Sequence, residues 1–178
     1  MSSEAAVDRS NRSLEDLARW AFGELGKRDL SAADDIWAQD AVDHFPTGDV
    51  VGRDGIVAYF RDMFASFPDI EIEVQNVVEA EPYVVVQWRA AATFTGSPFQ
   101  GVRATGRPVE FRGCDVVLIN DDRLVERNTI YWDGSALARQ IGLLPREGTA
   151  IDRAMLAAFN ALTWMRTLGG RRLRGARR

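Results

Sequence analysis

The amino-acid sequence predicts an α+β fold, with N-terminal helices packed in a curved, mainly antiparallel sheet of four to six strands. Apolar residues recur at helical spacing before about residue 70, and from there the pattern changes to the alternation typical of β-strands. The strand-like segments are separated by turn-forming residues, which indicates an antiparallel meander. Because 46% of the 178 residues are apolar, we expect one globular domain with a sizeable core and an appendage.

Three helices are expected before the sheet. The first begins at a capping box that starts at Ser13, the second has Trp37 on its buried side, and the third stops before Pro68. These helices cover residues 13–26, 29–41 and 52–67, and a short extended segment follows the second at 42–45.

Four strands and two further helices complete the expected order. A capping box at Thr149 opens the last helix. The strands cover residues 70–80, 83–96, 108–119 and 124–132, and the helices cover residues 136–142 and 153–168.

The last expected helix has an apolar face. We expect this face to pack on the domain or across a dimer, with membrane insertion as the alternative. Its members are Met155, Leu156, Phe159, Leu162 and Met165.

Charge is distributed unevenly along the chain. The segment 166–178 carries six arginines and no acidic residue, while the whole chain has a net charge of −4. The rest of the chain therefore carries about ten excess negative charges, so nucleic acid is not an expected partner. We divide the chain into a disordered N-terminus (1–12), a domain (13–145), a C-terminal helical extension (146–168) and an Arg-rich disordered tail (169–178).

Composition excludes several kinds of site. A single cysteine, Cys114, rules out a disulfide within the chain, and a single histidine, His44, rules out a multi-histidine metal site. No Gly-rich segment has the spacing of a phosphate-binding loop, so we expect neither a metal nor a cofactor. No apolar run approaches the ~20 residues of a membrane span, and the polar start lacks the apolar region of a signal peptide, so we expect a cytoplasmic protein.

The strand at residues 108–119 places a carboxylate among apolar side chains. Because strand side chains alternate, Asp115 shares a face with Phe111 and Val117, while Cys114 and Val116 lie on the other face. Burial of an unpaired carboxylate costs several kcal/mol or raises its pKa. We therefore expect Asp115 either to have a function or to have a structural partner such as Arg89, Arg112 or a backbone amide.

The order of elements, together with the segments "DAVDHFPTG", "GRDGIVAYF" and "YWDGSALARQIGLLP", resembles the SnoaL-like branch of the NTF2-like superfamily. That branch includes polyketide cyclases, ketosteroid isomerases and limonene-epoxide hydrolases. The resemblance covers about residues 13–145. It implies a cone in which the curved sheet encloses a deep apolar pocket for a small hydrophobic molecule, in a homodimer that pairs sheet to sheet.

The resemblance also implies candidate site residues. Asp115 matches the position at which ketosteroid isomerases carry a neutral carboxylic acid in the oxyanion hole. The general base would be His44 or Asp43, which point to opposite faces, so at most one of them faces inward. The implied pocket wall consists of Trp37, Tyr59, Phe60, Met63, Trp88, Phe111, Val117, Asn128, Ile130 and Trp132.

Three functions remain open from the sequence. The first is a cofactor-independent isomerase, cyclase or dehydratase that acts on a polyketide-, steroid- or terpenoid-like substrate. The second is an epoxide-hydrolase-like enzyme, in which Asp115 and another carboxylate flank Arg89 and activate water. The third is a module that binds a ligand, or assembles with a partner, without turnover.

Overall fold

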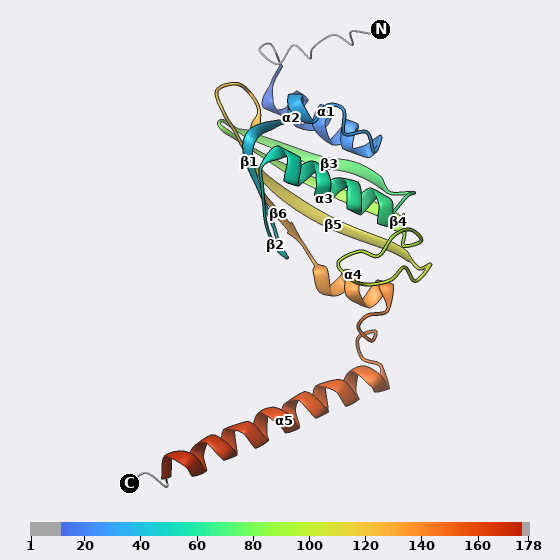
Figure 1. The fold of residues 1–178 in the computed structure, drawn as a ribbon, viewed down its shortest axis with the longest axis vertical. Coiled ribbons are helices and arrows are strands. Elements are labelled where there is room, and N and C mark those ends of the chain that lie inside the picture. The colour runs from blue at the N-terminus through green and yellow to red at the C-terminus, as the bar shows by residue number, and fades with distance from the viewer. Residues whose placement is uncertain (1–11, 176–178) are drawn as a thin grey trace.

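The computed structural model describes residues 12–175, with side chains as far as Thr167. The expected disordered N-terminus at 1–12 therefore lies almost wholly outside the described residues. In chain order the elements are α1 (Leu14–Gly26), α2 (Ala33–Ile36), β1 (Trp37–Phe45), β2 (Gly48–Val51), α3 (Arg53–Ser66), β3 (Glu71–Ala80), β4 (Tyr83–Thr93), β5 (Pro108–Ile119), β6 (Val125–Trp132), α4 (Gly134–Ile141) and α5 (Ala150–Gly175) (Figure 1).

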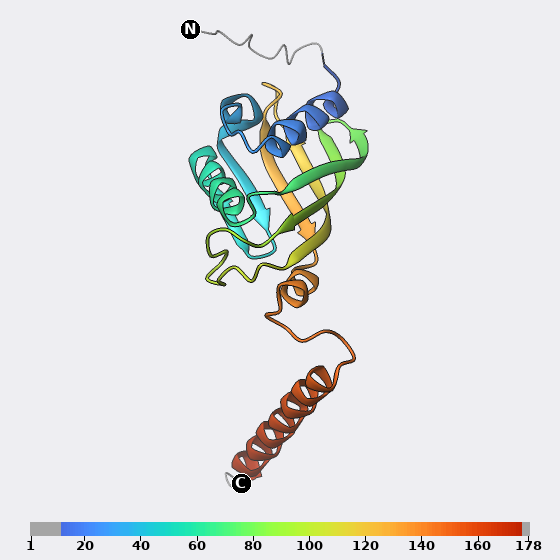
Figure 2. The same cartoon turned by 90° about the vertical axis from the view of Figure 1, so that its right-hand side faces the viewer.

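The six strands form one curved sheet in the order β2-β1-β6-β5-β4-β3. All neighbouring pairs are antiparallel except β1 and β6, which run parallel. The helices α1, α2 and α3 lie together on one face of this sheet, inside its curve (Figure 2). The expected α+β cone is thereby confirmed.

The segment expected as the second helix is mostly strand. Helix α2 ends at Ile36, and β1 begins at Trp37 and continues to Phe45. The expectation of helix over residues 37–41 was wrong. Trp37 pairs with Val125 of β6, and the strand continues into residues 42–45, which pair with β2 on one side and β6 on the other, so ladder hydrogen bonds outweigh a weak helical preference. The short strand β2 also had not been expected.

The connection between β4 and β5 is a long loop rather than a short turn. It covers residues 94–107, and its base is closed by hydrogen bonds between Phe94 and both Gly106 and Arg107. Farther out, Phe99 and Val102 form an isolated antiparallel bridge. The loop therefore folds back on itself and brings Phe99 toward the helices, where its ring meets those of Tyr59 and Phe67.

The core lies between the helices and the inner face of the sheet. Alternate residues of β4 are buried there, because a strand presents every second side chain to one face. On α1, the Ser13 hydroxyl caps the helix by accepting a hydrogen bond from the Asp16 N–H at 3.0 Å. The largest side chains that are buried almost completely are Phe94, Ile56, Ile70, Val84 and Val86.

The C-terminal part leaves the domain through α4. The Asp133 carboxylate caps the N-terminus of α4, and Gly142 ends the helix with φ of 86°, a conformation that glycine adopts without strain. Helix α5 then projects away from the domain (Figures 1 and 2), and it continues to Gly175, past the expected end at residue 168. Its apolar side chains are exposed to between 40% and 73%, so the expected alternative in which they pack on their own domain is wrong. Within the described residues, no helix combines the length and apolarity that a membrane span requires.

Candidate functional site

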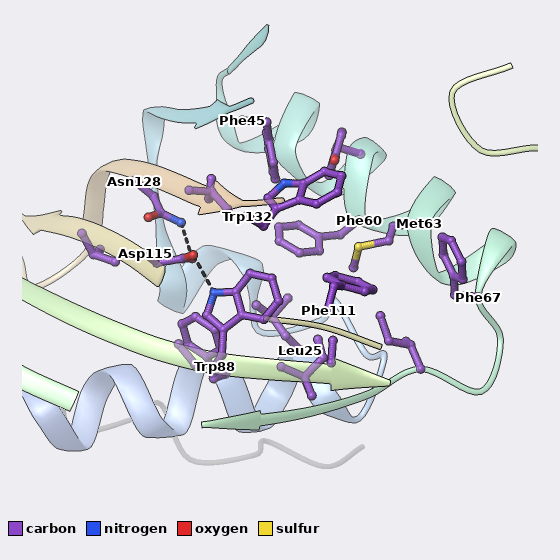
Figure 3. A pocket seen from close by; sticks show the side chains of 18 of the residues that line it. Leu25, Phe45, Phe60, Met63, Phe67, Trp88, Phe111, Asp115, Asn128 and Trp132 are labelled. Atoms are coloured by element: carbon purple, nitrogen blue, oxygen red, sulfur yellow. Dashed lines mark hydrogen bonds between the residues drawn. The ribbon is translucent and has the colours of Figure 1, made fainter. Parts of the chain in front are cut away.

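A cavity of about 110 Å³ lies between the helices and the inner face of the sheet. Its wall is almost entirely apolar, and Asp115 lies at one end of it with Trp88 and Asn128 (Figure 3). The structure places all ten residues of the expected pocket wall around this cavity, namely Trp37, Tyr59, Phe60, Met63, Trp88, Phe111, Val117, Asn128, Ile130 and Trp132. Their role in binding a ligand stays a prediction.

Other wall residues had not been expected. Phe22 and Leu25 belong to the apolar face of α1, so their helical spacing was a usable signal. Phe99 comes from the loop between β4 and β5, and nothing in the local pattern indicates that this loop returns to the cavity. The remaining members are Ala21, Ile36, Phe45, Phe67, Ile70, Ile72, Ala90, Val125 and Leu137.

Asp115 is buried and hydrogen-bonded by two side chains. The indole N–H of Trp88 donates to Oδ1 at 2.7 Å, and the amide of Asn128 donates to Oδ2 at 2.9 Å. Both donors lie on neighbouring strands, because Asp115 pairs with Val86 on β4 and Ile130 on β6, and each donor is two residues away on the same face. The expected alternatives of a partner in Arg89, Arg112 or the backbone are not what the structure shows.

Burial raises the pKa of Asp115 to about 6, and the hydrogen bonds from Trp88 and Asn128 oppose this rise because they stabilise the carboxylate. A group with this pKa is mostly ionised at pH 7. Its two partners supply N–H donors to it, as an ionised carboxylate requires.

Gly113 makes room for the indole that reaches Asp115. A Cβ atom at this position would lie 2.2 Å from Cζ2 of Trp88 and 2.6 Å from Cε2. Any larger residue at position 113 would therefore displace the Trp88 ring from its hydrogen bond.

Asp43 is a second buried carboxyl group close to the first. Asp43 is fully buried, and it pairs with Val50 on β2 and with Asn128 on β6. Neither carboxyl oxygen has a hydrogen-bond partner among the described residues, and the same is true of Oδ1 of Asn128. Asp43 does not line the cavity itself but lies behind its wall.

Burial is the main cause that raises the pKa of Asp43 to about 8, and the negative charge of Asp115 raises it further. The Trp37 side chain is close enough to offset part of this rise, although its indole N–H does not reach hydrogen-bonding geometry with either oxygen. At neutral pH the two carboxyl groups therefore hold about one proton between them.

His44 lies on the opposite face of β1, as the alternation of strand side chains requires. Its Nδ1 is 2.8 Å from the Asp49 carboxylate, and its side chain is one-third exposed in a shallow surface depression beside Thr129 and Tyr131. Of the two expected general bases, Asp43 faces inward and His44 faces outward. The geometry thus gives no support to His44 as a base in this cavity.

Arg89 also points away from Asp115. Its guanidinium lies on the outer face of the sheet, where it donates to the Glu110 carboxylate at 2.7 Å and approaches Glu73 at 3.8 Å. The predicted arrangement, in which Asp115 and another carboxylate flank this arginine, is therefore not present on the described part of the chain.

Tyr59 is the phenol on the cavity wall. Its ring stacks on Phe45 with centroids 4.0 Å apart. Burial raises the pKa of its hydroxyl to about 12, so the hydroxyl stays protonated and can donate a hydrogen bond. Among the side chains that the structure describes, no three metal-ligating groups come together.

Comparison with known structures supports the fold. AclR from Streptomyces galilaeus matches with a TM-score of 0.67 and 22% identity, over 91% of this chain and 98% of its own. TsrD from Streptomyces laurentii matches with a TM-score of 0.67 and 22% identity, over 78% of this chain and 99% of its own. IdmH from Streptomyces antibioticus matches with a TM-score of 0.63 and 26% identity, over 74% of this chain and 99% of its own.

No curated protein sequence matches the chain. A family model does match it, over residues 16–141, and its description is SnoaL-like polyketide cyclase. The match spans all the elements that build the cavity, from α1 to α4. The chain belongs to the SnoaL-like polyketide cyclase family.

Proposed function

We propose that this protein is a cofactor-independent acid/base enzyme that moves a proton at a carbon next to a carbonyl group in a small, flat, hydrophobic molecule. The reaction class covers isomerisation, cyclisation and dehydration of polyketide-, steroid- or terpenoid-like compounds. The observation that carries the proposal is that Asp115 is the one carboxylate on the apolar wall formed by the described residues.

Asp115 acts as the general base in this scheme. A base is most effective when its pKa lies near the working pH, and burial brings the pKa of Asp115 to about 6. This role differs from the neutral oxyanion donor that the resemblance implied. The two N–H donors on Asp115 favour its ionised form, whereas an oxyanion donor has to be protonated.

Two other groups support the base. Tyr59 keeps its proton and can donate a hydrogen bond to the oxygen on which negative charge develops. The raised pKa of Asp43 keeps this carboxyl group mostly neutral at pH 7, so the site holds about one negative charge rather than two. Asp43 does not line the cavity, so it contacts no ligand in this scheme.

The cavity volume limits the ligand. Engineered cavities of about 150 Å³ in protein cores bind benzene, so a cavity of about 110 Å³ holds no more than one ring without rearrangement. A larger ligand requires part of the wall to move. Three wall residues, Phe67, Ile70 and Phe99, belong to no helix or named strand, and Phe99 lies on the long loop between β4 and β5.

The test is exchange of the α-protons of a single-ring ketone, cyclohexanone, in D2O, followed by NMR. We expect the wild type to accelerate exchange and Asp115→Asn to lose at least about a hundredfold of that acceleration, the scale of a general base. His44→Gln is the matched control, because His44 lies outside the cavity, and it should keep the wild-type rate. An Asp115→Asn variant that exchanges nearly as fast as the wild type would exclude Asp115 as the base.

A second candidate is a ligand-binding module without turnover. It is favoured by the saturation of Asp115, since both of its oxygens already accept hydrogen bonds from side chains. Under this alternative, cyclohexanone would quench the fluorescence of the wall tryptophans in a saturable way, yet no variant would change the exchange rate.

A further inference from the structure

Helix α5 presents a continuous apolar face to solvent. A series of side chains repeats at alternating spacings of four and three residues, the pattern of a seam between two packed helices. Its members are Ile151, Met155, Ala158, Leu162 and Met165. Phe159 flanks this seam and is 65% exposed.

The domain of the same chain does not cover this seam. The buried Asp152 anchors the first turn of α5, because its carboxylate accepts a hydrogen bond from the Gly148 N–H at 3.0 Å and pairs with Arg139 at 3.3 Å. From this anchor the helix runs away from the sheet (Figures 1 and 2). Most helical stability in proteins comes from packing of an apolar face, and the described part of the domain does not supply that packing for α5.

The seam has the size of a helix-pair interface. From the exposed fractions of Ile151, Met155, Phe159, Leu162 and Met165, pairing would bury on the order of 600 Å² per copy, or about 1,200 Å² in total, which is the lower limit of a specific interface. Exposed apolar patches of this size on soluble proteins mark interaction sites.

Charge favours an antiparallel arrangement of two such helices. The segment 166–178 carries six arginines and no acidic residue, and the rest of the chain carries about ten excess negative charges. A parallel pair would bring two arginine clusters together. An antiparallel pair separates them, directs each cluster toward the acidic domain of the other copy, and aligns the two helix dipoles favourably.

The extension is also shared with a structural neighbour. The match to AclR covers 91% of this chain, whereas the match to IdmH covers 74%. The larger share exceeds what residues 13–145 provide, so the AclR fold includes a counterpart to part of the extension.

We propose that α5 is a dimerisation arm, which pairs with α5 of a second copy of this chain in antiparallel orientation through the Ile151-to-Met165 seam. The pairing is independent of the cavity and of its chemistry. It also differs from the sheet-to-sheet dimer that the family resemblance implied.

The first test measures molar mass by light scattering of the full chain at micromolar concentration. The Met155→Glu/Leu162→Glu variant places two charges in the seam and should raise the dimer dissociation constant at least tenfold. The control, Asn160→Glu/Thr167→Glu, places two charges with the same spacing on the opposite face of the helix and should stay dimeric. A wild type that is monomeric, or a seam variant that remains as dimeric as the control, would overturn the proposal.

The second test reads the orientation by disulfide crosslinking in a Cys114→Ser background. Ile151→Cys and Met165→Cys should crosslink when the two variants are mixed, and neither should crosslink efficiently alone. Crosslinking of each variant with itself would overturn the antiparallel arrangement. A monomeric wild type that cosediments with vesicles rich in phosphatidylserine would instead identify the helix and its arginines as a membrane-surface anchor.

Discussion

The cavity wall and the apolar face of α5 are built from the same kinds of side chain, yet only the first is enclosed by its own chain. Around the cavity, Trp37 and Ile130 are at most 6% exposed, because a curved sheet and three helices close over them. On α5, Ile151 is 73% exposed and Phe159 is 65% exposed. A helix that leaves the sheet has no second layer to pack against, whatever its composition.

This difference separates what apolar side chains do in the two regions. In the domain they stabilise the fold, and they raise the pKa values of the two carboxyl groups buried with them. On α5 the same side chains contribute to stability only when another surface covers them. Substitutions in the domain should therefore change the free energy of unfolding, whereas substitutions on α5 should change association.

The largest expected effect comes from a matched pair of phenylalanine truncations. Phe94 is 1% exposed and stacks on Phe67 with centroids 5.0 Å apart, so Phe94→Ala should lower the free energy of unfolding by about 3–5 kcal/mol. Phe159→Ala should leave it almost unchanged at concentrations at which the protein is monomeric. Urea unfolding of both variants at low concentration measures the two effects, and similar losses in both would remove the distinction between the regions.

The second effect is the pH dependence of stability that Asp43 imposes. Its pKa is raised from 3.8 to about 8 in the fold, so the folded state binds a proton that the unfolded chain releases. The contribution of Asp43 to stability is therefore greatest below about pH 4 and falls as the pH rises toward 8. Asp43→Asn should be more stable than the wild type in urea unfolding, by a free-energy gap that widens from pH 4 to pH 8 and reaches on the order of 2 kcal/mol or more.

Asp115→Asn is the internal control for this prediction. The pKa of Asp115 rises only to about 6. The difference in stability between Asp115→Asn and the wild type should therefore stop widening near pH 6. A gap that is independent of pH in Asp43→Asn would show that the buried carboxyl group is not the source of the pH dependence.

A smaller effect concerns the contact between Gly113 and Trp88. Gly113→Ala places a Cβ where the indole lies, so we expect a loss of about 1–3 kcal/mol, together with a higher pKa for Asp115 as the Trp88 hydrogen bond breaks. Gly23→Ala is the matched control: a Cβ there meets nothing within 4 Å, and alanine favours the helix. Thermal melting and the NMR titration of Asp115 report the two consequences, and equal melting temperatures would refute the close contact.

The smallest expected effect is that of Arg89→Gln. The guanidinium lies on the outer face of the sheet with Glu110, so the substitution should change neither the melting temperature nor the α-proton exchange rate. A large loss of exchange in this variant would show that the arginine takes part in the reaction, and it would favour the epoxide-hydrolase-like alternative.

The local sequence pattern was sufficient to predict the elements in which apolar residues recur with a clear helical or strand period. The alternation over residues 108–119 predicted that Phe111, Asp115 and Val117 share one face, and all three lie on the cavity wall. Alternation also predicted that Asp43 and His44 point to opposite faces of the chain. It could not predict which of the two side chains faces inward, because alternation separates the faces without saying which one the helices cover.

The sequence by itself determined the α+β class and the order of the main elements, because these depend on residue types and on periods of two or 3.6 residues. The residues of the cavity wall followed from the family resemblance. Only the tertiary structure decided the rest. The change from helix to strand at Trp37 depends on pairing with Val125 of β6, which lies much later in the chain. The partners of Asp115 are Trp88 and Asn128, 27 and 13 residues away, and they meet it only through the register of three strands. The raised pKa of Asp43 depends in the same way on burial and on the charge of Asp115, which folding brings close. Contacts of this kind have no local signature in the sequence.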